Sequence, residues 1–510
     1  MMGYLFLTGA TGLLGSYLVR DLLRAGTQLA VLVRSTKMAS ARHRVETLLA
    51  RWEKQAGHSL PRPVVFDGDL SRPDLGLTES DIAWISDNCD AVMHNAASLT
   101  FHAENRDDEP WRSNLYGTQH VLEMCRQTGI RRFHHVSTAY VCGLRRDRIF
   151  EDELDVGQTH GNDYEISKFE AEKLVRGAEF LDAPTIYRPS IIFGDSRTGY
   201  TTTFHGFYVP LKLVSTLIKK TAGMFSDRET VVAGIRMAGE RLRQVLNLSG
   251  SESKNYVPVD WVSAVMAHIY TQPEHHGETY HLTPRGRASV AMTQDVMEEA
   301  FLKYSEQASD AAATDVDWSS FEQQFLEGMG VYRSYWRDDP EFDQSNTSRV
   351  APHLPCPEID ATVIMRMCRF ALDTNFGWPR PAPVKPELDV EEHLSEIVGT
   401  GTPATGLAKK EVYLGLQVNG RGGGQWELTM DDGRITLAQP GLTSRCTATY
   451  YLNSQTFASL AKRESTVDQA IRDGSVLIEG NGVPLSELSR LLQGLAAKER
   501  TKSSHSSNFV

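Results

Sequence analysis

Residues 8–15 read TGATGLLG, and they directly follow an apolar, β-prone run at residues 3–8. From Leu14 onward, Leu14, Leu18 and Leu22 recur with the spacing of one helix face. The glycines of this stretch therefore stand between an expected strand and an expected helix. A helix N-terminus presents free backbone N–H groups and a partial positive charge there, which together suit a phosphate group.

The spacing Gly9-x-x-Gly12-x-x-Gly15 gives each glycine a separate task. The first permits a tight turn, the second lets the backbone approach a pyrophosphate, and the third lets the helix pack closely on the strand. Three glycines alone also fit a plain structural turn. Their place after the first strand and before a helix favours a dinucleotide site.

Short β-rich runs alternate with amphipathic segments from residue 3 to about residue 190. The expected strands are YLFLT, QLAVLVR, PVVFDG, DAVMHNAA, RRFHHVS and PTIYRPS. This alternation is typical of parallel βαβ units with helices on both faces of the sheet. We therefore predict an α/β fold with a Rossmann-type doubly wound parallel sheet, in a domain spanning residues 1–285.

From about residue 194 the pattern indicates a smaller substrate lobe. It combines amphipathic helices near 209–222 and 231–246 with a return strand at GETYHLT. The two helices can form a homodimer face, a substrate lid or plain core. Residues 286–394 carry no motif and one expected helix near 363–372, so we assign them to an extension of the lobe and a linker.

A second β-rich segment follows the linker sequence GTGTPATGLAKK. EVYLGLQVN, GQWELTMDD, GRITLAQ and CTATYYLN read as hairpin strands, and helices are expected near 453–473 and 484–497. Residues 395–497 are thus predicted to form an α+β domain. The polar residues 498–510 are predicted to be a disordered tail.

The composition is that of a soluble globular chain with two or three domains, since 41% of its 510 residues are hydrophobic and 23% charged. A net charge of -12 argues against nucleic-acid binding, which needs a clustered basic surface. The six cysteines form no CxxC pair, so we expect reduced thiols, no metal site and a cytoplasmic protein. Neither a signal peptide nor a membrane span is expected.

Arg34, at the end of the second expected strand, indicates which dinucleotide binds. An enzyme that prefers NAD places a carboxylate here for the ribose 2′-hydroxyl. A guanidinium, helped by Lys37 and Arg44, can instead hold the extra phosphate of NADP. The alternative is that these are solvated surface charges. We predict NADP(H) as the cofactor.

The next two strand ends also carry candidate cofactor residues. Asp69 and Leu70 follow the third strand and suit the adenine edge, whereas His94-Asn95-Ala96-Ala97 follows the fourth. The small residues Ala96 and Ala97 let a cofactor lie against the backbone. Ordinary loop chemistry is the alternative, but the regular spacing along the carboxyl edge of the sheet favours the cofactor.

The candidate catalytic residues are Thr138, Tyr164 and Lys168. Tyr164 and Lys168 stand four apart in YEISK, so on a helix they share one face, and the ammonium can lower the pKa of the phenol while holding a ribose. Such a phenol can donate a proton to a carbonyl as a hydride arrives. Thr138 would hydrogen-bond the same carbonyl oxygen. A lone YxxxK is more often a surface pair, but here it follows TGATGLLG and HNAA in chain order.

Residues 3–285 resemble an extended short-chain dehydrogenase/reductase, with TGxxGxxG, the hydroxyl of VST, YxxxK and RPS in order. Gly68-Asp69-Leu70, HNAASLTF and YEISKFEAE resemble the thioester-reductase and fatty acyl-CoA reductase branch. The resemblance implies NADPH-dependent reduction of an acyl thioester to an aldehyde, or to an alcohol after a second hydride. It implies catalysis by Thr138, Tyr164 and Lys168, and support from Asn114. The implied cofactor residues are Gly9, Thr11, Gly12, Leu13, Leu14, Gly15, Arg34, Arg44, Asp69, Leu70, Ala96, Ala97, Asn114, Tyr164, Lys168, Pro189 and Ser190.

Residues 395–497 resemble a sterol carrier protein 2 (SCP2) domain through VNGRGGGQWELTMDDG, CTATYYLNSQTFASLAKRE and DGSVLIEGN. That family folds as a sheet against helices around an apolar tunnel, which implies a lipid-like substrate. A mere packing or dimer surface is the alternative for this domain. The thioester donor, coenzyme A or a carrier protein, stays open because no carrier-protein serine motif is evident.

Two further functions remain open beside thioester reduction. One is oxidoreduction of a hydroxyl or keto group of a sterol or polyketide-like lipid, which needs the same three side chains. The other is a lipid carrier that binds NADP(H) without turnover. The intact Thr138 and YxxxK count against this carrier, since a binding module needs neither.

Overall fold

The computed structural model describes residues 3–37, 39–221, 236, 239–241, 243–304, 323, 326–327, 329–377, 388–399, 412–431, 434–443 and 445–480. Its contacts divide the chain into two compact units. The first comprises Met1–Thr27, Asp69–Gly76 and Asn88–Ala382, and the second comprises Gln28–Gly68, Leu77–Asp87 and Pro383–Val510.

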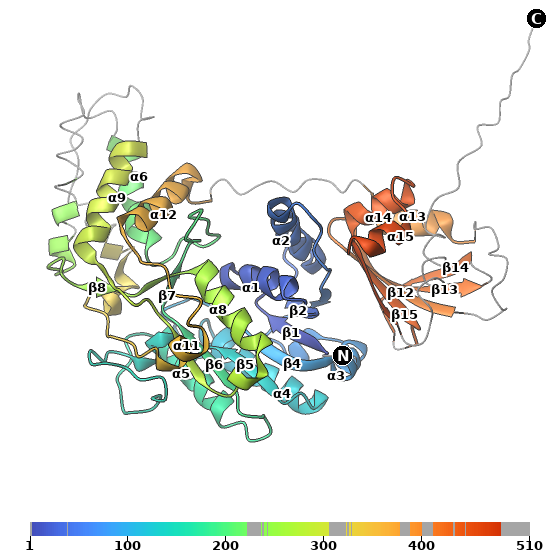
Figure 1. Cartoon of the computed structure of the whole chain (residues 1–510), viewed down its shortest axis with the longest axis horizontal. Helices are drawn as coiled ribbons and strands as arrows, with labels where there is room; N and C mark the ends of the chain where they lie inside the picture. Colours follow the sequence, from blue (N-terminus) through green and yellow to red (C-terminus); the bar gives the residue numbers. More distant parts are fainter. Residues whose placement is uncertain are drawn as a thin grey trace, which may run out of the picture. The chain divides into compact units, whose positions relative to one another are not determined.

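A seven-stranded sheet runs in the order β10-β6-β5-β4-β1-β2-β3. Figure 1 labels its strands β1, β2, β4, β5 and β6. Its described strand pairings are all parallel. The strands are β1 (Tyr4–Thr8), β2 (Leu29–Val33), β3 (Val64–Asp67), β4 (Cys89–His94), β5 (Arg132–Val136), β6 (Thr185–Pro189) and β10 (Thr279–Leu282). Every residue of β1, β2 and β6 is buried, which explains the nearly unbroken apolar sequences of β1 and β2. The doubly wound parallel sheet and its six expected strands are confirmed.

The strand order reverses between β1 and β4. This reversal indicates where a ligand-binding site is expected. In open α/β sheets a ligand binds beyond the carboxyl ends of the strands at such a switch point. The glycine turn at residues 9–12 follows β1, and Asn95 follows β4. Two loops that the sequence singled out therefore start from neighbouring strand ends.

The return strand at GETYHLT has a different place from the one expected. It forms β10, which pairs in parallel with β6 and so extends the main sheet rather than the substrate lobe. All four of its residues are buried. The reason is that no pattern within these four residues indicates the strand with which they pair.

Helices connect the strands as the alternation predicts. In the first unit they include α1 (Leu13–Arg24), α4 (Gly117–Thr128), α5 (Asp163–Arg176), α8 (Val259–Thr271) and the short helices η1 (Pro73–Gly76), η2 (Arg112–Tyr116), η3 (Ala139–Cys142) and η4 (Pro273–His275). In the second unit they include α2 (Ala41–Ala56) and α3 (Glu79–Asn88). No helix of the described residues is long and apolar enough to cross a bilayer.

Among the described residues, the region predicted as the substrate lobe contains two small sheets and three longer helices. Its elements are β7 (Ile191–Phe193), α6 (Tyr208–Thr221), β8 (Ser253–Lys254), β9 (Tyr256–Pro258), β11 (Ala288–Ser289), α9 (Val290–Tyr304), η5 (Arg333–Tyr335), α11 (Ser345–Val350), α12 (Ala361–Asp373) and η6 (Asn375–Gly377). Ile364 and Met367 of α12 pack with Phe193 and Leu211 in one buried cluster. The expected helices near 209–222 and 363–372 are thus confirmed, and α9 is an addition. Half of the expected helix at 231–246 lies outside the described residues, and residues 236, 239–241 and 243–245 of it are helical.

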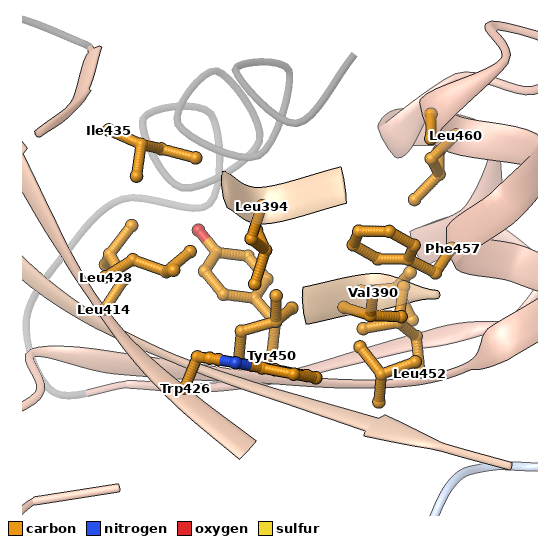
Figure 2. Close-up of a cluster of buried hydrophobic side chains, with 14 of the residues drawn as sticks. Val390, Leu394, Leu414, Trp426, Leu428, Ile435, Tyr450, Leu452, Phe457 and Leu460 are labelled. Carbon is orange, nitrogen blue, oxygen red and sulfur yellow. The ribbon is translucent and has the colours of Figure 1, made fainter. Parts of the chain in front are cut away.

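The second unit also contains a five-stranded mixed sheet in the order β14-β13-β12-β15-β16. Its strands are β12 (Val412–Asn419), β13 (Gly424–Asp431), β14 (Arg434–Pro440), β15 (Ala448–Asn453) and β16 (Val476–Gly480), with helices α13 (Val390–Ile397), α14 (Ser454–Ala461) and α15 (Val467–Arg472). In Figure 2, Val390 and Leu394 of α13 point toward Trp426 and Tyr450 of the sheet, in a cluster of buried apolar side chains. This is the predicted α+β domain.

Three details of that domain differ from the expectation. CTATYYLN is not a hairpin strand, because β15 pairs in parallel with β12. The helix expected at 453–473 is two helices, and residues 476–480 add the strand β16. Residues 400–410 of the expected linker 399–410, the helix expected near 484–497 and the tail lie outside the described residues.

Candidate active site

The glycine turn between β1 and α1 is so tight that two of its glycines have no room for a side chain. Gly9 has a φ of +71°, and a Cβ on it would lie 2.7 Å from the backbone nitrogen of Ala96. A Cβ on Gly15 would lie 2.0 Å from the carbonyl oxygen of Gly9. A Cβ on Gly12 would lie 3.4 Å from its nearest atom, which is also the carbonyl oxygen of Gly9. The first and third glycines serve the packing of the chain itself, whereas Gly12 leaves room for a ligand.

Thr8 holds the loop after β4 against this turn. Its Oγ1 hydrogen-bonds His94 Nδ1 at 2.8 Å and accepts the backbone N–H groups of Asn95 and Ala96 at 3.2 and 3.1 Å. Burial lowers the pKa of His94 to about 3, so the ring is neutral. The backbone of the predicted alanine pair is therefore fixed beside the glycine turn.

A cavity of about 660 Å³ opens next to the turn, within the first unit. Side chains of the lobe, among them Leu211, Met297 and Phe301, give it apolar walls. The sequence-predicted residues that line it are Gly9, Gly12, Leu13, Leu14, Gly15, Ala96, Ala97, Thr138, Tyr164, Lys168, Pro189 and Ser190. One cavity thus joins the predicted cofactor turn, the predicted catalytic residues and an apolar lobe.

Thr138 and Tyr164 face each other in this cavity. Thr138 follows β5, and its hydroxyl donates to the carbonyl oxygen of Pro189 at 3.4 Å and hydrogen-bonds the phenol of Tyr164. Tyr164 sits in the first turn of α5, which begins there because the side chain of Asn162 accepts the N–H of Glu165 at 2.9 Å. Burial raises the pKa of Tyr164 to about 12 against the opposing effect of Thr138, so the phenol carries the proton that a general acid needs.

Lys168 lies one turn further along α5. Its Nζ donates to the carbonyl oxygen of Val136 at 2.7 Å, and burial lowers its pKa to about 8. The sequence predicts that Lys168 lowers the pKa of Tyr164. In the structure the pKa of the phenol is raised instead, because burial raises it by more than the hydrogen bond with Thr138 lowers it.

Asn114, in η2, links two parts of the site. Its Oδ1 accepts the N–H of Ser98 at 2.8 Å, and its Nδ2 donates to Ser167 Oγ at 3.0 Å. Ser167 precedes Lys168 on α5. Asn114 therefore links the loop after β4 to α5, the helix of the predicted catalytic residues Tyr164 and Lys168.

Four predicted cofactor residues of the first unit are outside the cavity lining, namely Thr11, Asp69, Leu70 and Asn114. The carboxylate of Asp69 accepts the N–H and hydroxyl of Ser71 at 3.0 and 2.9 Å, which shapes the turn after β3. The carbonyl oxygen of Leu70 lies 2.7 Å from His120 Nδ1. These contacts fix the conformation of the loop after β3, which is the loop predicted to contact the adenine.

Ser190 supplies a direct test of whether the site fits a dinucleotide. Its buried Oγ has no hydrogen-bond partner among the described residues, and Ser190 lines the cavity. A buried hydroxyl without a partner costs free energy, and a polar ligand atom would remove that cost. Together with the open side of Gly12, this orphaned hydroxyl fits a bound nicotinamide dinucleotide.

The second unit holds the predicted phosphate contacts. Arg34 follows β2, and its carbonyl oxygen accepts from Arg44 Nη1 of α2 at 2.5 Å. Burial and then the nearby charge of Arg34 lower the pKa of Arg44. The positive charge of Arg34 thus disfavours the charged form of Arg44, and an anion beside both side chains would relieve this repulsion. Within this unit the pair has the chemistry of a phosphate site.

Sequence reasoning missed a buried ionic network that involves α5. Glu172 Oε1 lies 2.7 Å from Arg188 Nη2, and Glu172 Oε2 accepts from Ser137 Oγ at 2.7 Å. Burial raises the pKa of Glu172, but Arg188, Arg176 and Ser137 together bring it below its usual value. A signal existed, because Glu172 follows Lys168 by four residues and so shares its helix face.

It also missed Tyr332 and Tyr335, which line the cavity from the motif-free extension. The described residues hold no cluster of three or more histidine, cysteine or acidic side chains that could bind a metal ion.

The fold and the cavity define the domain as an NAD(P)-binding oxidoreductase. A family model described as "Male sterility protein" (NAD_binding_4) matches residues 7–266, which is just over half of the chain. The chain belongs to this family of NAD(P)-binding reductase domains.

Curated relatives are much longer than the matched region. A nonribosomal peptide synthetase (asaC) of Aspergillus flavus is 27% identical over 299 residues, which is 56% of this chain and 26% of the synthetase. A putative fatty acyl-CoA reductase (CG8306) of Drosophila melanogaster is 31% identical over 223 residues, or 37% of this chain and 43% of that protein. The chain thus spans less than half of the length of either relative.

Solved reductase domains share the fold. The terminal R domain of the myxalamid PKS-NRPS pathway is 25% identical with a TM-score of 0.57, over 74% of this chain and 92% of that domain. The R domain of a nonribosomal peptide synthetase from Mycobacterium tuberculosis has 21% identity and a TM-score of 0.50, over 74% of this chain and 93% of that domain.

Proposed function

We propose that this chain reduces an acyl thioester to an aldehyde, with NADPH as the hydride donor. The observation that carries the proposal is the single cavity that holds Thr138, Tyr164 and Lys168 between the glycine turn and an apolar lobe. The relatives named as a fatty acyl-CoA reductase and as synthetase R domains support a thioester substrate.

The side chains of the cavity would carry the reaction as follows. Reduced nicotinamide, when bound, supplies the hydride for the carbonyl carbon. Thr138 and Tyr164 hydrogen-bond the carbonyl oxygen, and Tyr164 transfers its proton to that oxygen as negative charge develops on it. Collapse of the resulting hemithioacetal breaks the C–S bond. The proton on oxygen then moves to the sulfur, giving an aldehyde and a free thiol.

Lys168 and the glycine turn would hold the cofactor in place. The ammonium of Lys168 donates to a ribose hydroxyl, and the backbone N–H groups beside Gly12 bind the pyrophosphate. Arg34 and Arg44 bind the 2′-phosphate, which makes NADPH the preferred cofactor. The orphaned hydroxyl of Ser190 gains a hydrogen-bond partner.

We take the substrate to be lipid-like because the lobe gives the cavity apolar walls. Its thiol part is coenzyme A or the phosphopantetheine arm of a carrier protein, and the homology to synthetase R domains favours the carrier. The test is to follow NADPH oxidation with fatty acyl-CoAs, the same acyl groups on a carrier protein, and steroid ketones, and to identify products by mass spectrometry. Aldehyde and free thiol support the proposal. Reduction of steroid ketones alone would replace it with ketoreduction.

For residues 395–497 we propose an SCP2-like domain that binds acyl chains. Support comes from the apolar sheet face covered by α13, with Trp426 and Tyr450 at its centre (Figure 2). A photoreactive fatty acid that carries a diazirine, incubated with the full chain, should label residues 412–480. If labelling is confined to the reductase cavity, the domain at residues 395–497 does not bind acyl chains and serves as a packing surface.

A further inference from the structure

Residues 329–343 of the extension, which we call the strap, pack against two loops beside the catalytic pair. The ring of Tyr335 lies 5.7 Å from that of Phe101 and 5.3 Å from that of Tyr140, measured between centroids. Phe101 in turn lies 5.6 Å from the ring of Tyr164, and the N–H of Tyr140 donates to Thr138 Oγ1 at 3.3 Å. Tyr335 thus packs on Phe101 and Tyr140. Phe101 contacts Tyr164, and Tyr140 contacts Thr138, so each residue of the Thr138–Tyr164 hydrogen bond has a neighbour that packs on Tyr335.

The hydroxyl of Tyr335 also contacts the start of α5. It accepts from Asn162 Nδ2 at 3.3 Å and hydrogen-bonds the carboxylate of Glu165. That carboxylate accepts the N–H of Gly161 at 2.8 Å, and Asn162 is the N-cap of the helix. Tyr164 stands between these two partners in the sequence. One phenol thus braces the helical turn that presents the catalytic tyrosine.

A buried ion pair fixes the strap itself. Lys254 Nζ donates to the carbonyl oxygen of Tyr335 at 2.6 Å and lies 3.1 Å from Asp339 Oδ1. Asp339 Oδ2 accepts from the hydroxyl of Tyr140 at 2.8 Å and from the N–H of Asn255 at 3.0 Å. Lys254 is 8% exposed and Asp339 is 2% exposed. Side chains this buried and this fully bonded hold a segment in one arrangement.

We propose that Tyr335 is a positioning residue for the catalytic tyrosine: its phenol fixes Asn162 and Glu165 so that the hydroxyl of Tyr164 stays against Thr138. The kinetic consequence rests on the proposed reductase function, whereas the ordering of α5 does not. The extension thereby has a role in the site, although its sequence carries no recognised motif.

The first test is kinetic and uses the full chain. Tyr335→Phe keeps the ring contacts and removes the hydroxyl, so we expect kcat to fall about tenfold. KM, the dissociation constant of NADPH and the melting temperature should stay close to those of the wild type. The matched control is Tyr280→Phe, which removes the hydroxyl of a buried tyrosine outside the cavity lining, where that hydroxyl donates to the carbonyl oxygen of His275. The control should keep its kcat.

The second test needs no turnover. Hydrogen exchange at the amides of Gly161 and Glu165, which donate to Glu165 and Asn162, should be about tenfold faster in Tyr335→Phe and unchanged in Tyr280→Phe. Unchanged exchange in Tyr335→Phe, or a loss of kcat no larger than that of the control, overturns the proposal. Faster exchange in a chain whose wild type reduces no thioester supports the positioning role and contradicts the reductase function.

Discussion

Arg188 Nη2 lies 2.7 Å from Glu172 Oε1, with 1% and 0% of the two side chains exposed. The pair joins the end of β6 to the helix that carries Tyr164 and Lys168. Removing one partner of a buried pair leaves an uncompensated charge, whereas an exposed pair contributes little.

We therefore predict that Glu172→Ala lowers the free energy of unfolding by about 3–5 kcal/mol. The control on the same helix is Glu170→Ala, which removes an exposed pair with Arg106 and should cost about 0–1 kcal/mol. Urea denaturation measures both. Equal losses would show that the buried pair does not hold the catalytic helix.

The glycine turn offers a pair of variants that separate folding from binding. Gly15→Ala should destabilise the domain, because its Cβ would lie 2.0 Å from the carbonyl oxygen of Gly9. Gly12→Ala should fold normally, since its Cβ would have 3.4 Å to the same atom, yet bind NADPH at least about tenfold more weakly. Thermal melting and fluorescence titration with NADPH distinguish the two effects. Wild-type affinity in Gly12→Ala would rule out the pyrophosphate beside Gly12.

Arg34 should determine the preference for NADPH over NADH. Arg34→Asp removes a phosphate partner and offers a carboxylate to the ribose, so the ratio of kcat/KM for NADPH to that for NADH should fall by about a hundredfold. Lys54→Asp makes the same change of charge at an exposed position of α2 and should leave the ratio unaltered. An unaltered ratio in Arg34→Asp would remove Arg34 from the cofactor site.

Lys168 should produce a basic limb in the pH profile. Burial lowers its pKa to about 8, so the ammonium is present below that pH and is lost above it. Because the charged form holds the cofactor, kcat/KM should be constant below this pKa and fall as the pH rises through about 8. Lys168→Met should have a low kcat/KM without this limb. An identical limb in Lys168→Met would assign it to another group.

The sequence predicted those parts of the molecule for which the residue pattern fits only one local structure. Strands buried on both faces, such as Leu29–Val33, need continuous apolar runs, and the crowding at Gly9 and Gly15 allows no other residue. Tyr164 and Lys168 were predictable because helical spacing alone puts them on one face.

Partners that are distant in the sequence could not be predicted in this way. Tyr140 and Asp339 are 199 residues apart, and no local pattern marks their hydrogen bond. The direction of β15 is another example, since the alternation of its side chains is the same in a parallel and an antiparallel pair. The place of β10 in the main sheet escaped prediction because no local pattern indicates that β6 is its partner.

The most direct test of the reductase function is hydride transfer by Tyr164→Phe, measured in a single turnover with a saturating acyl thioester while NADPH binding is titrated in parallel. The phenol is the proposed proton donor, so the variant should bind NADPH like the wild type and transfer hydride at least about a hundredfold more slowly. Hydride transfer at the wild-type rate in Tyr164→Phe would contradict the assignment of the acid and the mechanism built on it.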